Sequence, residues 1–299
     1  MKGTFKKIVE LAAREGPKTL ILAPAGNPEL CEVLSQAEKA NLIRPVLIGK
    51  AARIKEMVRQ TSLSRMEYEI IDESDDLASL TRALHMLRDG TGNILMQGNI
   101  DQSLFADIVF DKDAGLLRRA TASFISLYEL HRRDRLIMVT DTFINDSPSL
   151  SQKQDIVENA LSLTDMLGIN APKVAALAAI EQINPNIPST LDAAILSKMS
   201  QRRQFGNAVI EGPIDIDCAL SRSAAARKGV DSVVTGNVDI YLVPDIEAGY
   251  SLSQLLIFIG RMAMAGVVMG TTSPVILDLP YTTRASKFVE IALAVVTCG

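Results

Sequence analysis

Acidic residues and residues that shape the backbone are concentrated between residues 233 and 249, in the run VVTGNVDIYLVPDIEAG. Gly236 tolerates positive φ, so the TGN segment suits a sharp turn whose backbone N–H groups can face a ligand. Pro244 fixes φ and removes a donor, so a strand over residues 240–243 is expected to end there. The loop beyond it carries Asp245 and Glu247 at the carboxyl end of a strand, the edge where open α/β sheets bind ligands. The alternative is a surface loop whose acids are solvated.

The composition argues against several other kinds of site. The 31 Lys and Arg residues against 35 Asp and Glu residues give a net charge of -4, which does not indicate a nucleic-acid or anionic-membrane partner. Aromatic residues make up 4% of the chain and tryptophan is absent, so base-stacking platforms are not expected. The three cysteines are far apart and only two histidines are present, so we expect neither a structural metal nor a disulfide framework. No GxSxG elbow accompanies the histidines, which argues against a Ser-His-Asp triad.

The N-terminal segment and the most apolar window both indicate a cytoplasmic protein. The segment MKGTFKKIVELAAREG is amphipathic and lacks the unbroken apolar region of a signal peptide. Residues 255–277 are the most apolar window, but Arg261 and the TTSP run at 271–274 interrupt it. We therefore expect a buried helix and a buried strand there rather than a membrane span, and a reducing, cytoplasmic location.

Short apolar runs alternate with amphipathic segments along most of the chain. Strands are predicted at 18–23, 44–48, 68–71 and 93–96, and they alternate with helices at 4–15, 28–40, 50–60, 75–89 and 102–109. Strands separated by helices of this length predict βαβ units and a parallel sheet. Further helices are expected at 149–167, 189–200, 217–228, 251–270 and 286–297. Further strands are expected at 174–179, 207–211, 240–243 and 275–277, with another leading into the TGN turn.

The length of 299 residues favours two domains over a single core. Residues 117–139 depart from the alternation of helices and strands. Apolar residues alternate on both sides of the basic HRRDR turn, which predicts an antiparallel pair of strands. We place a domain boundary near Arg133 for this reason.

The segment GNVDIYLVPDIEAG at 236–249 resembles the signature of the phosphate acetyltransferase/phosphate butyryltransferase family. It is most similar to the butyryl branch, in which a GNADILLVP-x-IEAGN pattern stands in the same place. Other segments also look like family segments: LMQGNID at 95–101, VTDTFIN at 139–145, KVAALAAIEQINPNIPSTLDAAILSKMS at 173–200, EGPIDIDCAL at 211–220, AGVVMG at 265–270 and KFVEIALA at 287–294. The resemblance therefore extends over most of the chain.

The resemblance implies a two-domain α/β fold like that of the isocitrate and isopropylmalate dehydrogenases, with mostly parallel sheets and flanking helices. The last helix would return to the first domain, so residues 1–133 and 272–299 form the first domain and residues 134–271 form the second. The implied activity is the transfer of a short acyl group between coenzyme A and orthophosphate in a cleft between the domains, without a metal or redox cofactor. A homodimer formed through the second domain is expected. The alternative is a diverged member that binds acyl-CoA or acyl phosphate without efficient turnover.

Position by position, the resemblance places substrate-binding residues on three loops. The signature contributes Gly236, Asn237, Asp239, Pro244, Asp245, Glu247 and Gly249, a second loop of the same domain contributes Gly212, Pro213 and Asp217, and the first domain contributes Gly98 and Asp101. Asp239 could equally cap a neighbouring loop, and Asp217 also fits a helix N-cap. Gln97 and Tyr250 stand where the butyryl enzymes carry lysine and asparagine.

The implied catalytic segment departs from the family pattern. PVILDLPYTTRASK at 274–287 stands where the family has a PIVLTSRADSAETK pattern, so Leu279 and Pro280 occupy the Ser-Arg positions. Neither side chain can hydrogen-bond phosphate. Arg284, next to Thr283, is the expected catalytic replacement, because a guanidinium binds phosphate through two donors. The alternative is that Arg284 only decorates the last helix.

Overall fold

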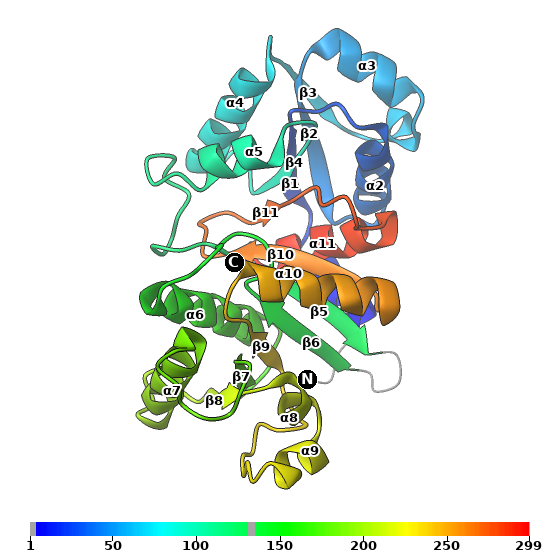
Figure 1. Cartoon of the computed structure of the whole chain (residues 1–299). Coiled ribbons are helices and arrows are strands. Elements are labelled where there is room, and N and C mark those ends of the chain that lie inside the picture. The colour runs from blue at the N-terminus through cyan, green and yellow to red at the C-terminus, as the bar shows by residue number, and fades with distance from the viewer. Residues whose placement is uncertain (1–3, 131–134, 299) are drawn as a thin grey trace. The chain divides into compact units, whose positions relative to one another are not determined.

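The computed structural model describes residues 4–130 and 135–298, which form two compact units (Figure 1). Residues 5–119 and 265–298 make up the terminal unit, and residues 120–264 make up the central unit. Each unit contains strands flanked by helices, and most neighbouring strands pair parallel. The predicted α/β class with mostly parallel sheets is therefore confirmed.

The strands of the terminal unit pair parallel except at one end of their order. They are β1 (Lys18–Ala23), β2 (Ile43–Gly49), β3 (Glu69–Asp72), β4 (Ile94–Gln97), β10 (Met264–Met269) and β11 (Val275–Ile276). Their order is β3-β2-β1-β4-β11-β10, and β10 and β11 pair antiparallel. Because β1, β4 and β11 are parallel neighbours, the loops that follow them meet at one edge.

Helices flank these strands on two sides. They are α1 (Phe5–Glu15), α2 (Pro28–Lys39), α3 (Ala51–Arg59), α4 (Asp76–Arg88), α5 (Gln102–Val109) and α11 (Arg284–Val296), with a 3-10 turn at Ser62–Arg65. Figure 1 shows α4 and α5 on one side of the strands and α2 on the other. The last helix, α11, packs against α1 and α2, and its residues 290–295 are all buried. This helix is therefore a central element of the terminal unit, as the resemblance implies.

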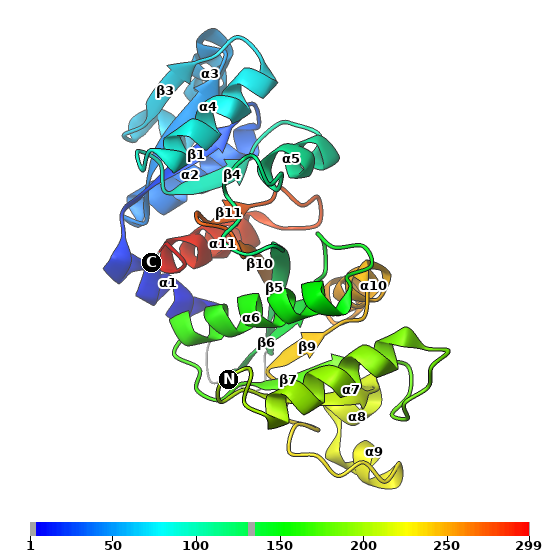
Figure 2. The same ribbon diagram turned by 90° about the vertical axis from the view of Figure 1, so that its left-hand side faces the viewer.

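The central unit contains an antiparallel pair of strands followed by parallel strands. Its strands are β5 (Ser123–Leu130), β6 (Arg135–Thr140), β7 (Lys173–Leu177), β8 (Val209–Ile214) and β9 (Ile240–Leu242), in the order β5-β6-β9-β7-β8. The antiparallel pair predicted at 117–139 is confirmed, because β5 and β6 pair with Ser126 opposite Val139. The helices are α6 (Leu150–Met166), α7 (Pro188–Gln201), α8 (Ile216–Leu220), α9 (Arg222–Arg227) and α10 (Ile246–Gln254). In Figure 2, α6 and α7 lie in front of the strands, so both cover one face.

The division between the units differs from the predicted boundaries. The boundary expected near Arg133 lies outside the described residues. The chain divides between Arg119 and Ala120, because β5 pairs with β6 and so belongs to the central unit. The second division lies between Met264 and Ala265 rather than between residues 271 and 272, because β10 pairs with β11 of the terminal unit.

The prediction of one long helix over residues 251–270 is wrong. α10 begins at Ile246, continues as a π-helical turn over Leu255–Ile259 and ends at Gly260, and β10 follows. Arg261 has a φ of 49°, which an α-helix does not allow. Residues 264–269 are all buried, and a short, continuously buried apolar run fits a strand that is covered on both faces.

Two further local predictions need correction. The strand expected to lead into the TGN turn does not form. Residues 230–239 contain bends, a turn and irregular backbone, and β9 begins only at Ile240. The helix predicted over 217–228 is two helices, α8 and α9. Ser221 between them is extended, with a φ of -139°, and its side chain caps α9. Neither these helices nor any other helix in the described part of the chain is long and apolar enough to cross a membrane.

Candidate functional site

A polar hollow of about 440 Å³ lies at the carboxyl edge of the strands of the terminal unit. It is lined by Asn27, Gln97, Gly98, Asn99, Ile100, Asp101, Gln102 and Asp278, and we call it the loop pocket. These residues come from the ends of β4 and β11 and from the starts of α2 and α5, so segments far apart in the sequence meet here. Of the predicted site residues, Gly98 and Asp101 line this pocket. The sequence did not indicate Asn99, Ile100, Gln102 or Asp278, although Asp278 directly follows a predicted strand.

Gly98 allows two backbone segments to touch at the loop pocket. Its N–H group donates to the Ala23 carbonyl at 3.1 Å, and the Asn99 N–H group donates to the Pro24 carbonyl at 2.9 Å. A Cβ atom on residue 98 would stand 1.9 Å from the Pro24 carbonyl oxygen. The end of β1 and the loop after β4 are therefore held in direct backbone contact, which fixes the shape of the pocket.

Two helices begin at the loop pocket. Asn27 caps α2 by accepting from the Glu29 N–H group at 2.9 Å, and Asp101 caps α5 by accepting from the Leu104 N–H group at 3.0 Å. The first turn of a helix carries N–H groups without helical partners and a partial positive charge, so both helix starts favour an anion. The Asp101 carboxylate, predicted to bind substrate, is engaged in its cap.

Gln97 joins the two segments that form the pocket wall. It is 2% exposed. Its Oε1 accepts from the Asp278 N–H group at 3.1 Å, and its Nε2 donates to the Ile100 carbonyl at 3.3 Å. Both ends of the side-chain amide are therefore satisfied, and Gln97 holds the pocket backbone in place.

The segment after β11 has no polar side chain at the expected Ser-Arg positions. Leu279 is 1% exposed, so its side chain belongs to the core of the terminal unit. Pro280 is exposed. Thr283 caps α11, because its Oγ1 accepts from the Ser286 N–H group at 3.1 Å. Thr283 thus has a structural role at the start of the last helix.

Arg284 is the first residue of α11 and lies beside the start of α2. Its guanidinium donates to Glu29 Oε1 at 3.3 Å, and 56% of its side chain is exposed. Glu29 lies in the first turn of α2, two residues beyond Asn27, which lines the loop pocket. An exposed, singly bonded arginine keeps the freedom to change partner.

In the central unit, the PDIEAG part of the signature turns directly from β9 into α10. Asp245 caps α10 by accepting from the Ala248 N–H group at 2.8 Å. Glu247 is exposed in the first turn, where a negative charge suits the helix dipole. Gly249 allows close packing, because a Cβ atom there would stand 2.6 Å from the Asp141 carbonyl oxygen. Each of these three signature residues therefore helps to build the turn itself.

An apolar hollow of about 520 Å³ opens beside this turn. It is lined by Leu177, Ala178, Ala179, Asp215, Ile216, Val243, Pro244, Ala248, Ser251, Leu252 and Leu255, and we call it the apolar pocket. Leu177 ends β7, whereas Asp215 and Val243 directly follow β8 and β9. The pocket therefore lies at the carboxyl ends of parallel strands, and Pro244 is the predicted site residue that lines it.

The structure does not bring the two halves of the signature together. Gly236, Asn237 and Asp239 precede β9, and the PDIEAG turn follows it. Gly236 has a φ of 69°, which fits the predicted TGN turn. Asp239 accepts from the Arg135 guanidinium at 3.2 Å and from the Lys173 N–H group at 3.0 Å. Asp239 thus ties together the amino ends of β6, β7 and β9, which matches the capping alternative.

Gly212 and Pro213 lie inside β8 rather than on a loop. A Cβ atom on residue 212 would stand 2.7 Å from the Ala176 carbonyl oxygen and 2.9 Å from the Ala193 Cβ atom. Gly212 therefore lets β7 and α7 approach β8 closely. Pro213 is buried, so packing within the central unit accounts for both residues.

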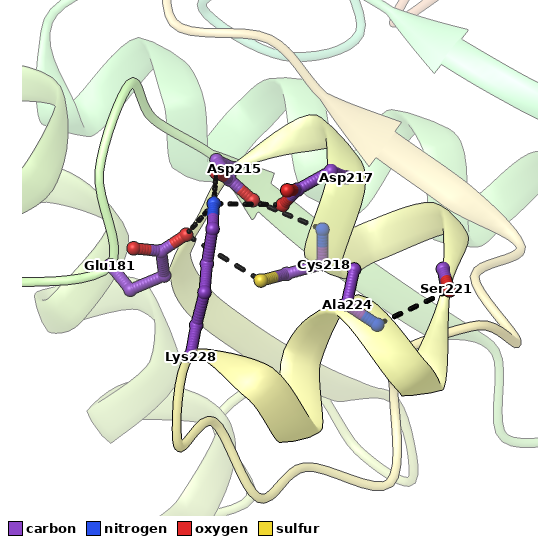
Figure 3. A network of polar contacts seen from close by, with 7 residues as sticks. All are labelled: Glu181, Asp215, Asp217, Cys218, Ser221, Ala224 and Lys228. Carbon is purple, nitrogen blue, oxygen red and sulfur yellow. Dashed lines mark hydrogen bonds and ion pairs between the residues drawn. The ribbon is translucent and has the colours of Figure 1, made fainter.

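Asp217 lies in a cluster of three carboxylates around Lys228 (Figure 3). The Lys228 Nζ donates to Glu181 Oε1 and Asp217 Oδ1, each at 2.9 Å, and to Asp215 Oδ2. Hydrogen bonds to Asp215, Glu181 and Asp217 raise the pKa of Lys228, so an ammonium occupies the space that a metal ion would need among these acids. The N-cap of α8 is Asp215, which accepts from the Cys218 N–H group at 3.0 Å, and not Asp217.

Asp141 is a buried acid that the sequence did not single out. It is 2% exposed, and it accepts from the Phe124 N–H group at 3.2 Å and from the N–H groups of residues 143, 144 and 145 at 2.9, 3.1 and 3.1 Å. Burial raises the pKa of Asp141, whereas these hydrogen bonds oppose the rise. The carboxylate fixes the loop after β6, onto which Gly249 packs.

Comparison with known proteins relates the whole chain to one family. A sequence profile described as Phosphate acetyl/butaryl transferase matches residues 80–296, which is more than half of the chain. The chain is 33% identical over 296 residues to the Phosphate butyryltransferase of Clostridium acetobutylicum, covering 99% of this chain and 98% of that protein. It is also 33% identical over 292 residues to the Phosphate acetyltransferase of Thermotoga maritima, covering 98% of this chain and 99% of that protein.

A solved structure agrees at the level of the fold. The branched-chain phosphotransacylase from Enterococcus faecalis V583 matches with a TM-score of 0.81 and 24% identity, covering 94% of this chain and 99% of that chain. This likeness supports the α/β fold of the chain. Given the profile match and the two relatives that align along almost their whole length, the chain belongs to the phosphate acetyl/butyryl transferase family.

Proposed function

We propose that the protein is an acyltransferase that moves a short acyl group between coenzyme A and orthophosphate. The observation that carries this proposal is the 33% identity over 296 residues to a Phosphate butyryltransferase, which includes both units. Coenzyme A is a substrate in this reaction, and we propose no bound metal or redox cofactor. The protein would act in the cytoplasm.

The two pockets offer what the substrates need. Phosphate is an anion, and the loop pocket joins polar side chains to the starts of α2 and α5. Acyl chains are apolar, and the apolar pocket is lined mainly by leucine, alanine, valine and proline side chains. We therefore assign phosphate contact to the loop pocket, through Gly98 and the N–H groups beyond Asp101, and acyl contact to the wall that contains Pro244.

Release of free thiol from acyl-CoA tests the proposal. Purified protein is incubated with acetyl-, butyryl- and isobutyryl-CoA, with and without phosphate, and coenzyme A is measured with a thiol reagent. We expect thiol release that requires phosphate. The protein's own thiols add little to the signal, because burial raises the pKa of Cys31, Cys218 and Cys298 to about 12 in each case.

The same experiment separates the two hypotheses. Calorimetric binding of coenzyme A without thiol release for any acyl group would favour a diverged member that binds without turnover. If neither binding nor release occurs at millimolar substrate, the proposed function is wrong.

Arg284 is proposed as the side chain that binds the phosphate substrate. We expect Arg284→Ala to raise the KM for phosphate by roughly tenfold or more, because a hydrogen bond to a charged group contributes about 1.5–3 kcal/mol. Arg284→Lys should lose less, since it keeps the charge. Arg53→Ala, at an exposed position in α3, is the matched control. If the KM of Arg284→Ala stays within twofold of wild type, Arg284 only decorates α11.

We also propose a homodimer formed through the central unit. The end of α10 and its π-helical turn expose large apolar side chains: Leu255 is 54%, Phe258 64% and Ile259 77% exposed. An exposed apolar patch of this kind is typical of a protein interface. Light scattering at micromolar concentration should give twice the mass of one chain, and Phe258→Asp should give the monomer. A monomeric wild-type protein would contradict the proposal.

A further inference from the structure

Three charged side chains lie together behind the wall of the loop pocket. Asp278 follows β11 and lines the pocket. Lys287 and Glu290 stand on one face of α11, at positions i and i+3. The Lys287 Nζ forms an ion pair with Asp278 Oδ1, although only 9% of the Lys287 side chain and 24% of the Asp278 side chain are exposed. This ion pair is therefore largely removed from water.

Glu290 is the third member of the cluster and is 1% exposed. Its Oε1 accepts from the Gly266 N–H group at 3.2 Å, and its Oε2 has no hydrogen-bond partner within residues 4–130 and 135–298. Burial raises the pKa of Glu290 to about 7, the charge of Lys287 opposes that rise, and the charge of Asp278 adds to it. The pKa of Glu290 is therefore closer to neutral pH than that of a solvent-exposed glutamate.

Packing alone does not explain these charges. A buried ion pair is often no more stable than apolar residues of the same size, because removing the charges from water costs more than their attraction returns. The rest of the buried run of α11, residues 291–295, is apolar. This ion pair ends at the wall of the loop pocket, where the Asp278 carboxylate can meet a ligand.

Asp278 is held at the pocket from two directions. Its N–H group donates to Gln97 Oε1 at 3.1 Å, and its Oδ1 accepts from Lys287. Its Oδ2 forms no hydrogen bond with any residue that the structure describes, so it is free to accept from a ligand. The next two residues, Leu279 and Pro280, offer no polar side-chain atom. Asp278 is therefore the ionisable group that this segment brings to the pocket.

We propose that Asp278 contacts coenzyme A in the loop pocket, that Lys287 is the positioning residue that holds its carboxylate there, and that Glu290 modulates the hold of Lys287 on Asp278. This inference rests on the proposed function. A carboxylate repels the phosphate substrate, but it accepts hydrogen bonds from the amide N–H groups of the coenzyme A arm, which acyl-CoA and free coenzyme A share. The amide N–H groups of the coenzyme A arm are therefore assigned to the Asp278 side of the pocket.

Glu290 makes this contact depend on pH. When Glu290 is protonated, the charge of Lys287 acts on Asp278 alone. When Glu290 is ionised, its charge also attracts Lys287 and repels Asp278, so the hold of Lys287 on Asp278 is weaker. The elements packed on α11 are α1, α2 and β11, and β10 reaches Glu290 through the Gly266 N–H group. Their buried faces add no charge, because those of α1, β10 and β11 are apolar and that of α2 carries only apolar groups, Ser35 and the neutral Cys31 thiol.

Kinetics with butyryl-CoA and inorganic phosphate test the contact. We expect Asp278→Ala to lower kcat/KM for butyryl-CoA by roughly 30-fold or more, because a charge-assisted hydrogen bond is lost, while the KM for phosphate stays within about threefold. Lys287→Met should lower kcat/KM by roughly tenfold or more, and Lys287→Arg should restore most of it. Asp107→Asn, at an exposed position in α5, is the matched control.

The pH dependence tests the role of Glu290. The measured quantity is the ratio of kcat/KM for Glu290→Gln to that of wild type between pH 6 and pH 8, in which the titration of phosphate and thiol cancels. Glutamine resembles protonated glutamate and can still accept from the Gly266 N–H group. We therefore expect a ratio near one at pH 6 that rises by about threefold or more at pH 8, where wild-type Glu290 is ionised and the glutamine stays neutral.

Each outcome decides a separate point. A folded Asp278→Ala protein with kcat/KM within threefold of wild type overturns the contact, whatever happens to Lys287→Met. A ratio for Glu290→Gln that is constant from pH 6 to pH 8 overturns the role of Glu290. Wild-type protein without phosphate-dependent thiol release refutes the proposed function and this inference together. Wild-type activity with unaffected variants refutes the inference alone.

Discussion

Gly98→Ala is expected to reduce the rate of acyl transfer by roughly 100-fold or more and to lower the free energy of unfolding by about 3 kcal/mol. The added methyl group would meet the Pro24 carbonyl oxygen at 1.9 Å and the Pro24 carbonyl carbon at 2.8 Å, and neither atom belongs to a side chain that can rotate away. The end of β1 and the loop after β4 must separate. That separation displaces Asn99 and the start of α5, which form the wall of the loop pocket.

Steady-state kinetics and urea unfolding measure the two effects of Gly98→Ala. Gly168→Ala is the matched control, because residue 168 has a φ of 70° and no atom within 4 Å of an added Cβ. We expect it to lose only about 1 kcal/mol, from backbone strain, and to keep full activity. Normal activity and stability of Gly98→Ala would show that the two backbone segments are not in contact.

Asp141→Asn is expected to lower the free energy of unfolding by about 3–5 kcal/mol. The carboxylate accepts from four backbone N–H groups, those of Phe124 and of residues 143, 144 and 145. Asparagine has one acceptor oxygen, and its amide nitrogen would face buried donors that already lack water. Each buried donor left without a partner costs about 1–3 kcal/mol.

Urea unfolding at pH 7 measures this loss, with the exposed Asp107→Asn as the control, for which we expect a change within about 0.5 kcal/mol. The loop that Asp141 fixes lies against Gly249, so the variant should also weaken the turn into α10 and raise the KM for acyl-CoA. If the stability of Asp141→Asn equals that of the control, the carboxylate does not hold this loop.

Local patterns in the sequence were sufficient for the fold class. Apolar runs such as KTLILA and RPVLIG, each followed by an amphipathic segment, predicted β1, β2 and the helices between them, because a period of two or of 3.6 residues is visible within one element. Cap residues were visible for the same reason, since Asn27 and the Pro at the start of α2 act on their own helix. The alternation around the HRRDR turn predicted the pairing of β5 with β6.

Local patterns failed where burial on all sides removes the periodicity. The run MAGVVM at 264–269 is apolar at every position, so it shows neither period, and the sequence predicts a helix where the structure has β10. Whether such a run is a helix or a strand depends on its neighbours, here β11 and the break at Arg261. The predicted domain boundaries differ from the observed ones for a related reason. A strand belongs to the unit of the strand with which it pairs, and these pairings, β5 with β6 and β10 with β11, join residues of separate elements.

The sequence alone determined the family and the residues that carry its signature, because both are properties of residue order. Only the tertiary structure decided which of those residues meet. It separated Gly236, Asn237 and Asp239 from the PDIEAG turn by placing them at opposite ends of β9. It joined Asp278, which follows β11, to Gln97 at the end of β4 and to Lys287 on α11, at and behind the wall of the loop pocket. Contacts of this kind depend on the order of strands in a sheet, which no local pattern of residues encodes.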